Sequence, residues 1–204
     1  MFRRSGLILL LAMICMNWPA SAQPSADAPG QILGGDPNAP IRIEVFSDFQ
    51  CSACREFYLN TIRQVLPEYA GKNKVCVIYH EFPLAMHKYS RDAARYAEAA
   101  ARLGVQRLLP VMDSIFMDQA IWSQDGKLEA SVSKALPHED FLKLKKIMLD
   151  PSINEAVERE YQLGMKSEIK STPTMFVSYS GKRQKVEGMI TYLVLKQFID
   201  KIIK

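Results

Sequence analysis

Apolar residues cluster in short runs near both ends of the chain, and these runs predict β-strands. The first run covers residues 41–47, and the second covers about residues 74–82 and stops at Pro83. Between them, residues 51–70 have the spacing of a helix that ends at the Gly-Lys-Asn sequence of residues 71–73. A strand, a helix and a strand in this order predict a βαβ unit with parallel strands and a right-handed crossover.

The middle of the chain has helical spacing and almost no strand signal. Residues 87–103 are rich in alanine. Further helix-like segments cover about residues 106–118, 127–136, 138–149 and 152–167. We expect Ser152 to cap the last of these helices and Glu155 to complete a capping box. Residues 86–167 are therefore predicted to form a helical insertion.

Strand signals return at residues 174–178 and 184–187, on either side of a turn-forming Ser-Gly sequence. This pattern predicts an antiparallel hairpin, and the spacing from residue 191 to 203 predicts a closing helix. The order βαβ, helices, ββα predicts one α/β domain built from residues 34–85 and 168–204, interrupted by the helical insertion.

The first 22 residues have the features of a secretory signal peptide. Arg3 and Arg4 precede an apolar core at residues 7–16, and Ala-Ser-Ala at 20–22 predicts cleavage after Ala22. The apolar core is shorter than the ~20 residues that a membrane anchor needs. Small and turn-forming residues predict a flexible lead-in over residues 23–33. We therefore expect a periplasmic or secreted protein.

Charge and cysteine content narrow the function classes. Loss of the signal peptide lowers the formal charge from +4 to +2, and no arginine-rich or aromatic-basic cluster indicates a nucleic-acid partner. The mature chain keeps Cys51, Cys54 and Cys76, and an odd number of cysteines does not predict a disulfide scaffold. Cys76 lies in an apolar strand-like run, and we expect it to be a small buried hydrophobic residue.

The sequence Cys51-Ser-Ala-Cys54 is the strongest chemical signal, because it stands where the first strand meets the helix. At a helix N-terminus the helix dipole stabilises a thiolate. Cys54 lies one helical turn further in, close enough to attack the Cys51 sulfur. The pattern therefore predicts thiol–disulfide exchange, with Cys51 as the reactive cysteine and Cys54 as the resolving one.

Zinc sites use the same cysteine spacing, so a metal site is an alternative. Further ligands would have to come from Cys76, His80, His87 or His138, and the sequence contains no second CxxC motif. We expect no bound metal and no cofactor.

Thr172 and Pro173 stand directly before the third predicted strand. A proline at a strand entrance is ordinary. A cis peptide bond there would instead hold the Thr172 backbone toward a neighbouring site, where it could pair with an extended substrate segment. We expect these two residues to bind substrate.

Glu44 is a carboxylate inside the first predicted strand. Alternation places it with Arg42 and Phe46 on the face opposite Ile43 and Val45. A buried Glu near Cys54 would carry its proton during exchange with a raised pKa. The alternative is a glutamate that is exposed at an edge or paired with an arginine.

Taken together, these motifs resemble the DsbA-like thiol–disulfide oxidoreductases, which have a thioredoxin fold. The matching sequences are Gly35-Asp-Pro-Asn-Ala-Pro40, Glu44-Val-Phe-Ser-Asp-Phe-Gln-Cys-Ser-Ala-Cys54, His80-Glu-Phe-Pro-Leu84 and Ser171-Thr-Pro-Thr-Met-Phe-Val177. The resemblance implies a thioredoxin core with an inserted helical domain. It also implies Cys51 as nucleophile, Cys54 as resolving cysteine, Thr172 before a cis Pro173, and Glu44 as the strand glutamate.

The same resemblance implies that the protein exchanges disulfides with unfolded or partly folded exported proteins. A membrane partner of the quinone-linked type would reoxidise it, and we expect a monomer. Strong oxidases of the family carry Pro-His between the cysteines, where this chain has Ser52-Ala53. The direction of the reaction therefore stays open: an oxidase is expected, a reductase or isomerase is the alternative, and a metal-binding thioredoxin-like protein is a more distant one.

Overall fold

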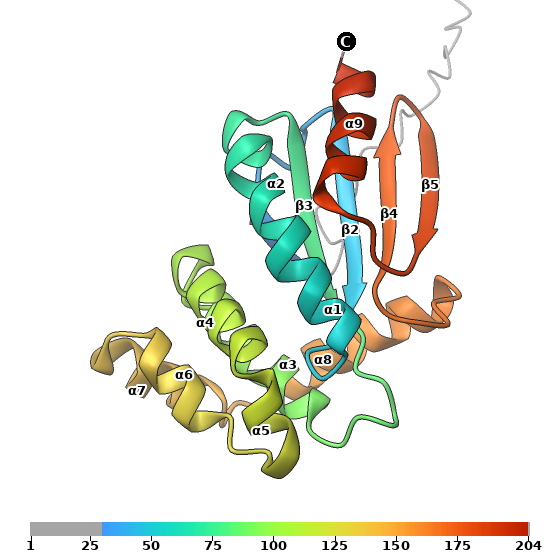
Figure 1. Ribbon diagram of the computed structural model, residues 1–204. Helices are drawn as coiled ribbons and strands as arrows, with labels where there is room; N and C mark the ends of the chain where they lie inside the picture. The colour runs from blue at the N-terminus through green and yellow to red at the C-terminus, as the bar shows by residue number, and fades with distance from the viewer. Residues whose placement is uncertain (1–29, 204) are drawn as a thin grey trace, which may run out of the picture.

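A computed structural model describes residues 30–203, which form a five-stranded sheet covered by helices (Figure 1). The strands are β1 (Gln31–Gly34), β2 (Ile41–Ser47), β3 (Val75–Glu81), β4 (Thr174–Tyr179) and β5 (Lys182–Glu187). Their order in the sheet is β1-β3-β2-β4-β5. The pair β2 and β3 is parallel and every other pair is antiparallel. The predicted βαβ unit and hairpin are confirmed, and β2 is central.

One face of the sheet is covered by the helical connection between β2 and β3 and by the last helix (Figure 1). These segments are α1 (Ser52–Phe57), the π-helical turn η1 (Tyr58–Ile62), α2 (Arg63–Glu68), the 3-10 turn η2 (Ala70–Lys72) and α9 (Tyr192–Ile203). The single helix predicted over residues 51–70 thus contains a wide π turn.

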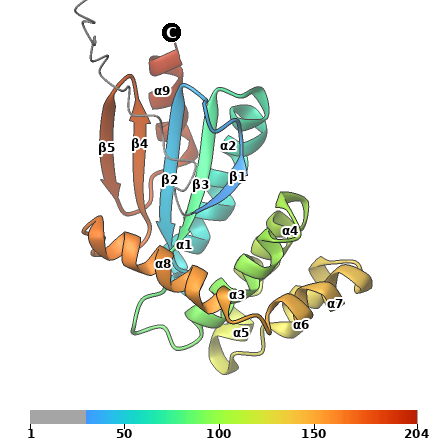
Figure 2. The same cartoon turned by 180° about the vertical axis from the view of Figure 1, so that it is seen from behind.

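All helices of the predicted insertion lie between β3 and β4 in the chain. They are α3 (Ser90–Ala101), α4 (Val105–Met117), α5 (Gln119–Asp125), α6 (Glu129–Ala135), α7 (His138–Ile147) and α8 (Ser152–Lys166). Seen from behind, α8 crosses the end of the sheet where β2 ends (Figure 2). The short helix α5 fills the gap that the sequence pattern left between residues 118 and 127.

Alternation along the strands divides the buried side chains between the two faces. Ile43 and Val45 belong to the large core cluster that also contains Cys54. On the opposite face, Phe46 packs in a smaller cluster with Phe82, Ile169 and Phe176. The cysteine helix therefore rests on the Ile43 face of the sheet.

Two local predictions are wrong. The lead-in predicted over residues 23–33 ends earlier, because Gln31–Gly34 pairs with β3 as an edge strand. Ser152 does not cap α8 with its side chain. Instead, the Asp150 carboxylate accepts a hydrogen bond from the Ser152 amide at 2.9 Å, and the Ser152 hydroxyl accepts one from Arg102.

The predicted signal peptide, its cleavage site after Ala22 and the lead-in up to residue 29 lie outside the described residues. Within residues 30–203, no helix has the length and apolar character needed to cross a membrane.

Candidate active site

The two cysteines occupy the start of α1, directly after the loop that leaves β2. Cys51 is the N-cap residue, with φ −77° and ψ 122°, and its side chain is half-buried. Cys54 lies in the first turn and is completely buried. Both thiols are free, so the structure shows the reduced pair. One sulfur is accessible to a substrate and the other is shielded, as the predicted roles require.

The environment separates the acidities of the two thiols. The hydrogen bond from the Cys54 thiol, aided by the backbone amides of Cys54 and Ala53 and by Thr172, lowers the pKa of Cys51 from 9.0 to about 5, although burial opposes this. Burial and the neighbouring Cys51 raise the pKa of Cys54 well above 9.0. Cys51 is therefore a thiolate at neutral pH and Cys54 is a thiol.

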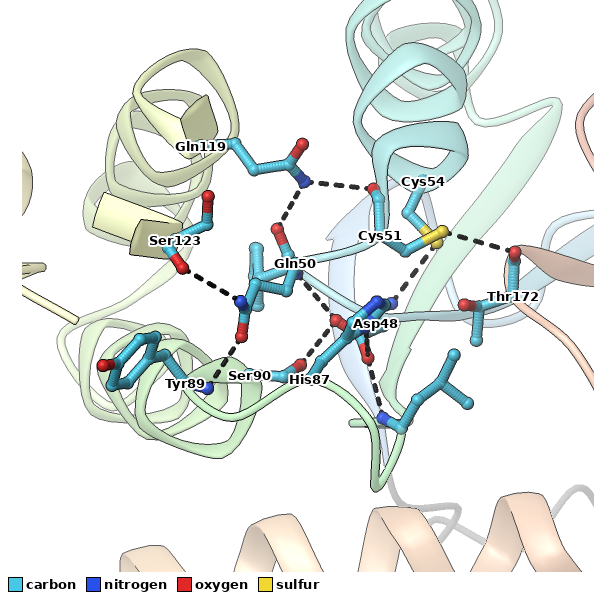
Figure 3. Close-up of polar contacts among 12 residues, drawn as sticks. Asp48, Gln50, Cys51, Cys54, His87, Tyr89, Ser90, Gln119, Ser123 and Thr172 are labelled. Carbon is cyan, nitrogen blue, oxygen red and sulfur yellow. Dashed lines mark hydrogen bonds and ion pairs between the residues drawn. The ribbon is translucent and has the colours of Figure 1, made fainter. Parts of the chain in front are cut away.

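Thr172 and Pro173 lie beside this thiolate, as predicted. The Cys51 Sγ lies 3.5 Å from the carbonyl oxygen of Thr172 (Figure 3), and the Thr172–Pro173 peptide bond is cis. The Pro173 carbonyl accepts a hydrogen bond of 2.8 Å from the amide of Gly188, which follows β5. The last turn before β4 is thus fixed against the reactive sulfur.

Asp48 organises the loops around the cysteines, and sequence reasoning missed it. Its buried carboxylate accepts hydrogen bonds from the Leu84 amide at 2.7 Å, from His87 Nδ1 at 2.9 Å and from the Ser90 hydroxyl at 2.5 Å (Figure 3). Its own amide donates to the Cys54 Sγ at 3.4 Å. The sequence feature that could have pointed to Asp48 is its position inside the motif that ends at Cys54.

Two glutamines connect the cysteine loop to the helical insertion. The buried Gln119 side chain donates to the carbonyls of Phe49, at 2.6 Å, and Cys51, at 3.0 Å. Gln50 accepts a hydrogen bond from the Tyr89 amide and donates to the Ser123 carbonyl (Figure 3). The backbone at Cys51 is therefore held by helix α5 as well as by the sheet.

The structure does not bring Glu44 to the cysteine pair. Ile43 and Val45 pack in the core cluster of Cys54, and alternation turns Glu44 to the opposite face of the sheet. The same alternation is readable in the sequence. What the sequence pattern left undecided was which face the cysteine helix would cover.

On that opposite face Glu44 is surrounded by cations. Its carboxylate lies 3.3 Å from Arg42 and 3.6 Å from both His80 and Arg183. Burial raises its pKa, but the neighbouring His80 and the positive charges of Arg42 and Arg183 outweigh burial, so the pKa of Glu44 lies below 4.5. The raised pKa expected for Glu44 is wrong, and the alternative of a glutamate paired with arginine describes the geometry.

Cys76 and the histidines stay apart from the cysteine pair. Cys76 is fully buried in β3, as predicted, and burial raises the pKa of its thiol. His80 contacts Glu160 at 2.7 Å on the far face, and His87 contacts Asp48. Across residues 30–203, no three His, Cys, Asp or Glu side chains gather in a way that could hold a metal ion.

Comparison with known proteins agrees with this geometry. A family model described as thioredoxin matches residues 27–201. Probable disulfide bond formation protein D of Bacillus cereus is 27% identical over 178 residues, covering 85% of this chain and 79% of that protein. Disulfide bond formation protein D of Bacillus subtilis is 24% identical over 200 residues, covering 92% of this chain and 83% of that protein.

Solved structures show the same fold. Wolbachia pipientis alpha-DsbA1 superposes with a TM-score of 0.70 at 20% identity, covering 85% of this chain and 90% of that one. Oxidised BdbD from Bacillus subtilis superposes with a TM-score of 0.69 at 21% identity, covering 84% and 91%. The thioredoxin fold expected from the sequence is confirmed. The chain belongs to the thioredoxin family, and it is a DsbA-like member with the dithiol site of a thiol–disulfide oxidoreductase.

Proposed function

We propose that this protein introduces disulfide bonds into exported proteins outside the cytoplasm, using Cys51 and Cys54. The observation that carries the proposal is the contrast between the two sulfurs. Cys51 is partly exposed, with its pKa lowered to about 5, and Cys54 is buried, with its pKa raised. A low pKa makes Cys51 a good leaving group, which favours passing the disulfide on to a substrate.

The reaction begins with the Cys51–Cys54 disulfide. A substrate thiolate attacks the Cys51 sulfur, the bond between the two cysteines breaks, and Cys54 leaves as a thiolate that takes up a proton. A second substrate thiolate then attacks the substrate sulfur of the mixed disulfide and releases Cys51 as a thiolate. The substrate has lost two electrons and the pair has gained them, so a membrane redox partner of the quinone-linked type must reoxidise the pair.

The surroundings of Cys51 suit an extended, partly unfolded substrate. The backbone of Thr172 and Pro173 lies beside the sulfur and is placed to pair with a substrate segment. Met86 lies in the loop that Asp48 holds and is 81% exposed. Such an apolar side chain gives unfolded chains a sequence-independent contact.

The competing function is disulfide reduction or isomerisation by the same site. It stays open because Ser52-Ala53 stands between the cysteines, where strong oxidases of the family carry Pro-His. The reduction potential of the pair, measured in glutathione buffers, separates the two directions. A potential toward about −120 mV supports the oxidase, and a potential near −230 mV or lower supports the reductase.

Refolding of a reduced, disulfide-containing test protein checks the exchange itself. Cys51→Ser should abolish oxidation, and Cys54→Ser should accumulate mixed disulfides through Cys51. Turnover that persists in Cys51→Ser contradicts the proposal. A stoichiometric metal in the purified protein, lost when either cysteine is replaced, would support the metal-binding alternative instead.

A further inference from the structure

One buried glutamine side chain from the helical insertion holds the backbone on both sides of the reactive cysteine. Gln119 is the first residue of α5 and is 7% exposed. Its side-chain nitrogen donates hydrogen bonds to the carbonyl oxygens of Phe49, at 2.6 Å, and Cys51, at 3.0 Å (Figure 3). A side-chain amide nitrogen carries two hydrogens, so both donors of Gln119 are used on this one loop.

These contacts complete the fixing of three successive peptide groups. The carbonyl of Phe49 belongs to the first of them and is held by Gln119. In the second, the Cys51 amide donates to the Asp48 carbonyl at 3.1 Å. In the third, the Cys51 carbonyl accepts the Arg55 amide at 3.1 Å together with Gln119. Peptide groups are planar, so fixing the groups on both sides of Cys51 also fixes its φ and ψ angles.

The backbone angles of Cys51 decide where its sulfur lies. With φ −77° and ψ 122°, Cys51 has the extended conformation of an N-cap residue. A side chain in this position faces the free amides of the first helical turn. For Cys51 these include the amides of Ala53 and Cys54, both of which lower the pKa of its thiol. The same conformation places the sulfur 3.5 Å from the Thr172 carbonyl oxygen. A change in φ or ψ would move the sulfur relative to all of these groups.

Gln119 is itself held in place, because α5 is anchored in the helical insertion. Trp122, one turn further along α5, is fully buried, and its ring nitrogen donates to the Ile115 carbonyl of α4 at 2.7 Å. Near the end of α4, the Phe116 carbonyl accepts a hydrogen bond of 3.0 Å from the Arg55 side chain of α1. A positioning side chain needs a rigid support of this kind.

The neighbouring Gln50 makes a different connection. It accepts a hydrogen bond from the Tyr89 amide at 2.7 Å and donates one to the Ser123 carbonyl at 3.3 Å. Neither partner belongs to Cys51 or to α1. The contacts of Gln50 therefore tie the loop to the insertion, whereas those of Gln119 act on the backbone of Cys51 itself.

We propose that Gln119 is a positioning residue for the Cys51 sulfur, because its two hydrogen bonds keep Cys51 in the N-cap conformation that turns the sulfur toward the first-turn amides. The proposal rests on the exchange function described above and adds the residue that prepares the sulfur for it. Through this one side chain, the helical insertion contributes to the chemistry of the cysteine pair.

The test replaces Gln119 by methionine, which is unbranched and of similar length but has no N–H donor. Two buried carbonyls then lose a donor, and the loop relaxes. The pKa of Cys51, followed by thiolate absorbance, should rise by about one unit from its value of about 5. At about pH 4, alkylation of Cys51 by iodoacetamide should then slow about tenfold. The reduction potential at neutral pH should fall by about 30 mV, which corresponds to the same tenfold change.

Gln124→Met is the matched control, because Gln124 is an exposed glutamine of the same helix and donates to the Ala120 carbonyl within α5. It should keep the wild-type pKa, alkylation rate and potential. Urea unfolding of both variants separates positioning from a merely structural role. If Gln119→Met is less stable but titrates and reduces like the wild type, the inference is wrong and the exchange function stands. If the wild type does not oxidise a reduced test protein, the exchange function fails whatever the titrations show.

A second measurement on the unaltered protein covers the case in which Gln119→Met does not fold. In nuclear magnetic resonance spectra of the reduced protein, the side-chain amide signals of Gln119 should exchange slowly with water and should shift with pH through the titration of Cys51 at about 5. The exposed side chain of Gln124 provides the internal comparison and should do neither. Gln119 signals that exchange quickly and ignore this titration overturn the proposal.

Discussion

Replacing Cys54 by alanine should raise the pKa of the Cys51 thiol by about 1–2 units. The Cys54 thiol is the largest of the causes that hold the pKa of Cys51 at about 5, ahead of the backbone amides and Thr172. A hydrogen bond to a charged group contributes about 1.5–3 kcal/mol, and one pKa unit corresponds to 1.36 kcal/mol. The expected pKa in Cys54→Ala is therefore about 6–7.

The ultraviolet absorbance of the thiolate, followed against pH, measures this pKa directly. Cys54→Ser is the matched control, because its hydroxyl can still donate a hydrogen bond to the Cys51 sulfur and should keep the pKa close to the wild-type value. If the alanine and serine variants titrate together at about 5, the helix N-terminus alone sets the acidity of Cys51 and the reasoning fails.

The lowered pKa of Cys51 should also make the free energy of unfolding of the reduced protein depend on pH. The pKa of Cys51 falls from 9.0 to about 5 on folding, so the stabilisation is complete above pH 9 and is lost as the pH falls through 5. Four units correspond to at most about 5 kcal/mol, and screening by water at this partly exposed sulfur leaves about 2–3 kcal/mol. Urea unfolding should show this pH dependence in the reduced protein and not in the oxidised one, and parallel profiles would refute it.

Three further changes test the surrounding structure. Burial opposes protonation of His80, but the hydrogen bond to Glu160 and the nearby carboxylate of Glu44 raise its pKa above 6.5. Urea unfolding should therefore show His80→Gln losing about 3 kcal/mol below pH 6.5, and less as the pH rises through the folded-state pKa. Gly164→Ala would place a Cβ 2.2 Å from the Phe82 ring, and overpacking should cost about 1–3 kcal/mol in thermal unfolding. Asp48→Ala leaves the Leu84 amide without its acceptor and should make that loop more sensitive to limited proteolysis.

The fold and the cysteine pair could be predicted because their signals are local. Apolar runs and helical spacing define the strands and helices, and Cys51 and Cys54 are three residues apart at a junction that the same pattern locates. The strand β1 escaped prediction because it is four residues long and exists through its pairing with β3. Its stability comes from a partner that lies far away in the sequence.

Glu44 in β2 and Glu81 in β3 show where sequence reasoning stopped. Alternation correctly separated Glu44 from Ile43 and Val45. Alternation alone does not give the distance from Glu44 to Cys54. The cysteine helix covers the apolar face of the strand, which is the face opposite Glu44. Glu81 lies in a continuous buried run of β3, where every position is buried and the pattern does not distinguish the two faces. Only the register with Ser47 places it on the cysteine side.

The position of the reactive sulfur depends on both parts of the chain. The Cys51 carbonyl accepts a hydrogen bond from Gln119 in the insertion, while its sulfur lies against Thr172 from the other end of the sequence. Asp48 joins these contacts to the loop that leads into α3. Because the insertion holds the backbone at the start of α1, it helps to position the thiolate. Changes in α5 that leave both cysteines intact are therefore expected to alter the reactivity of Cys51.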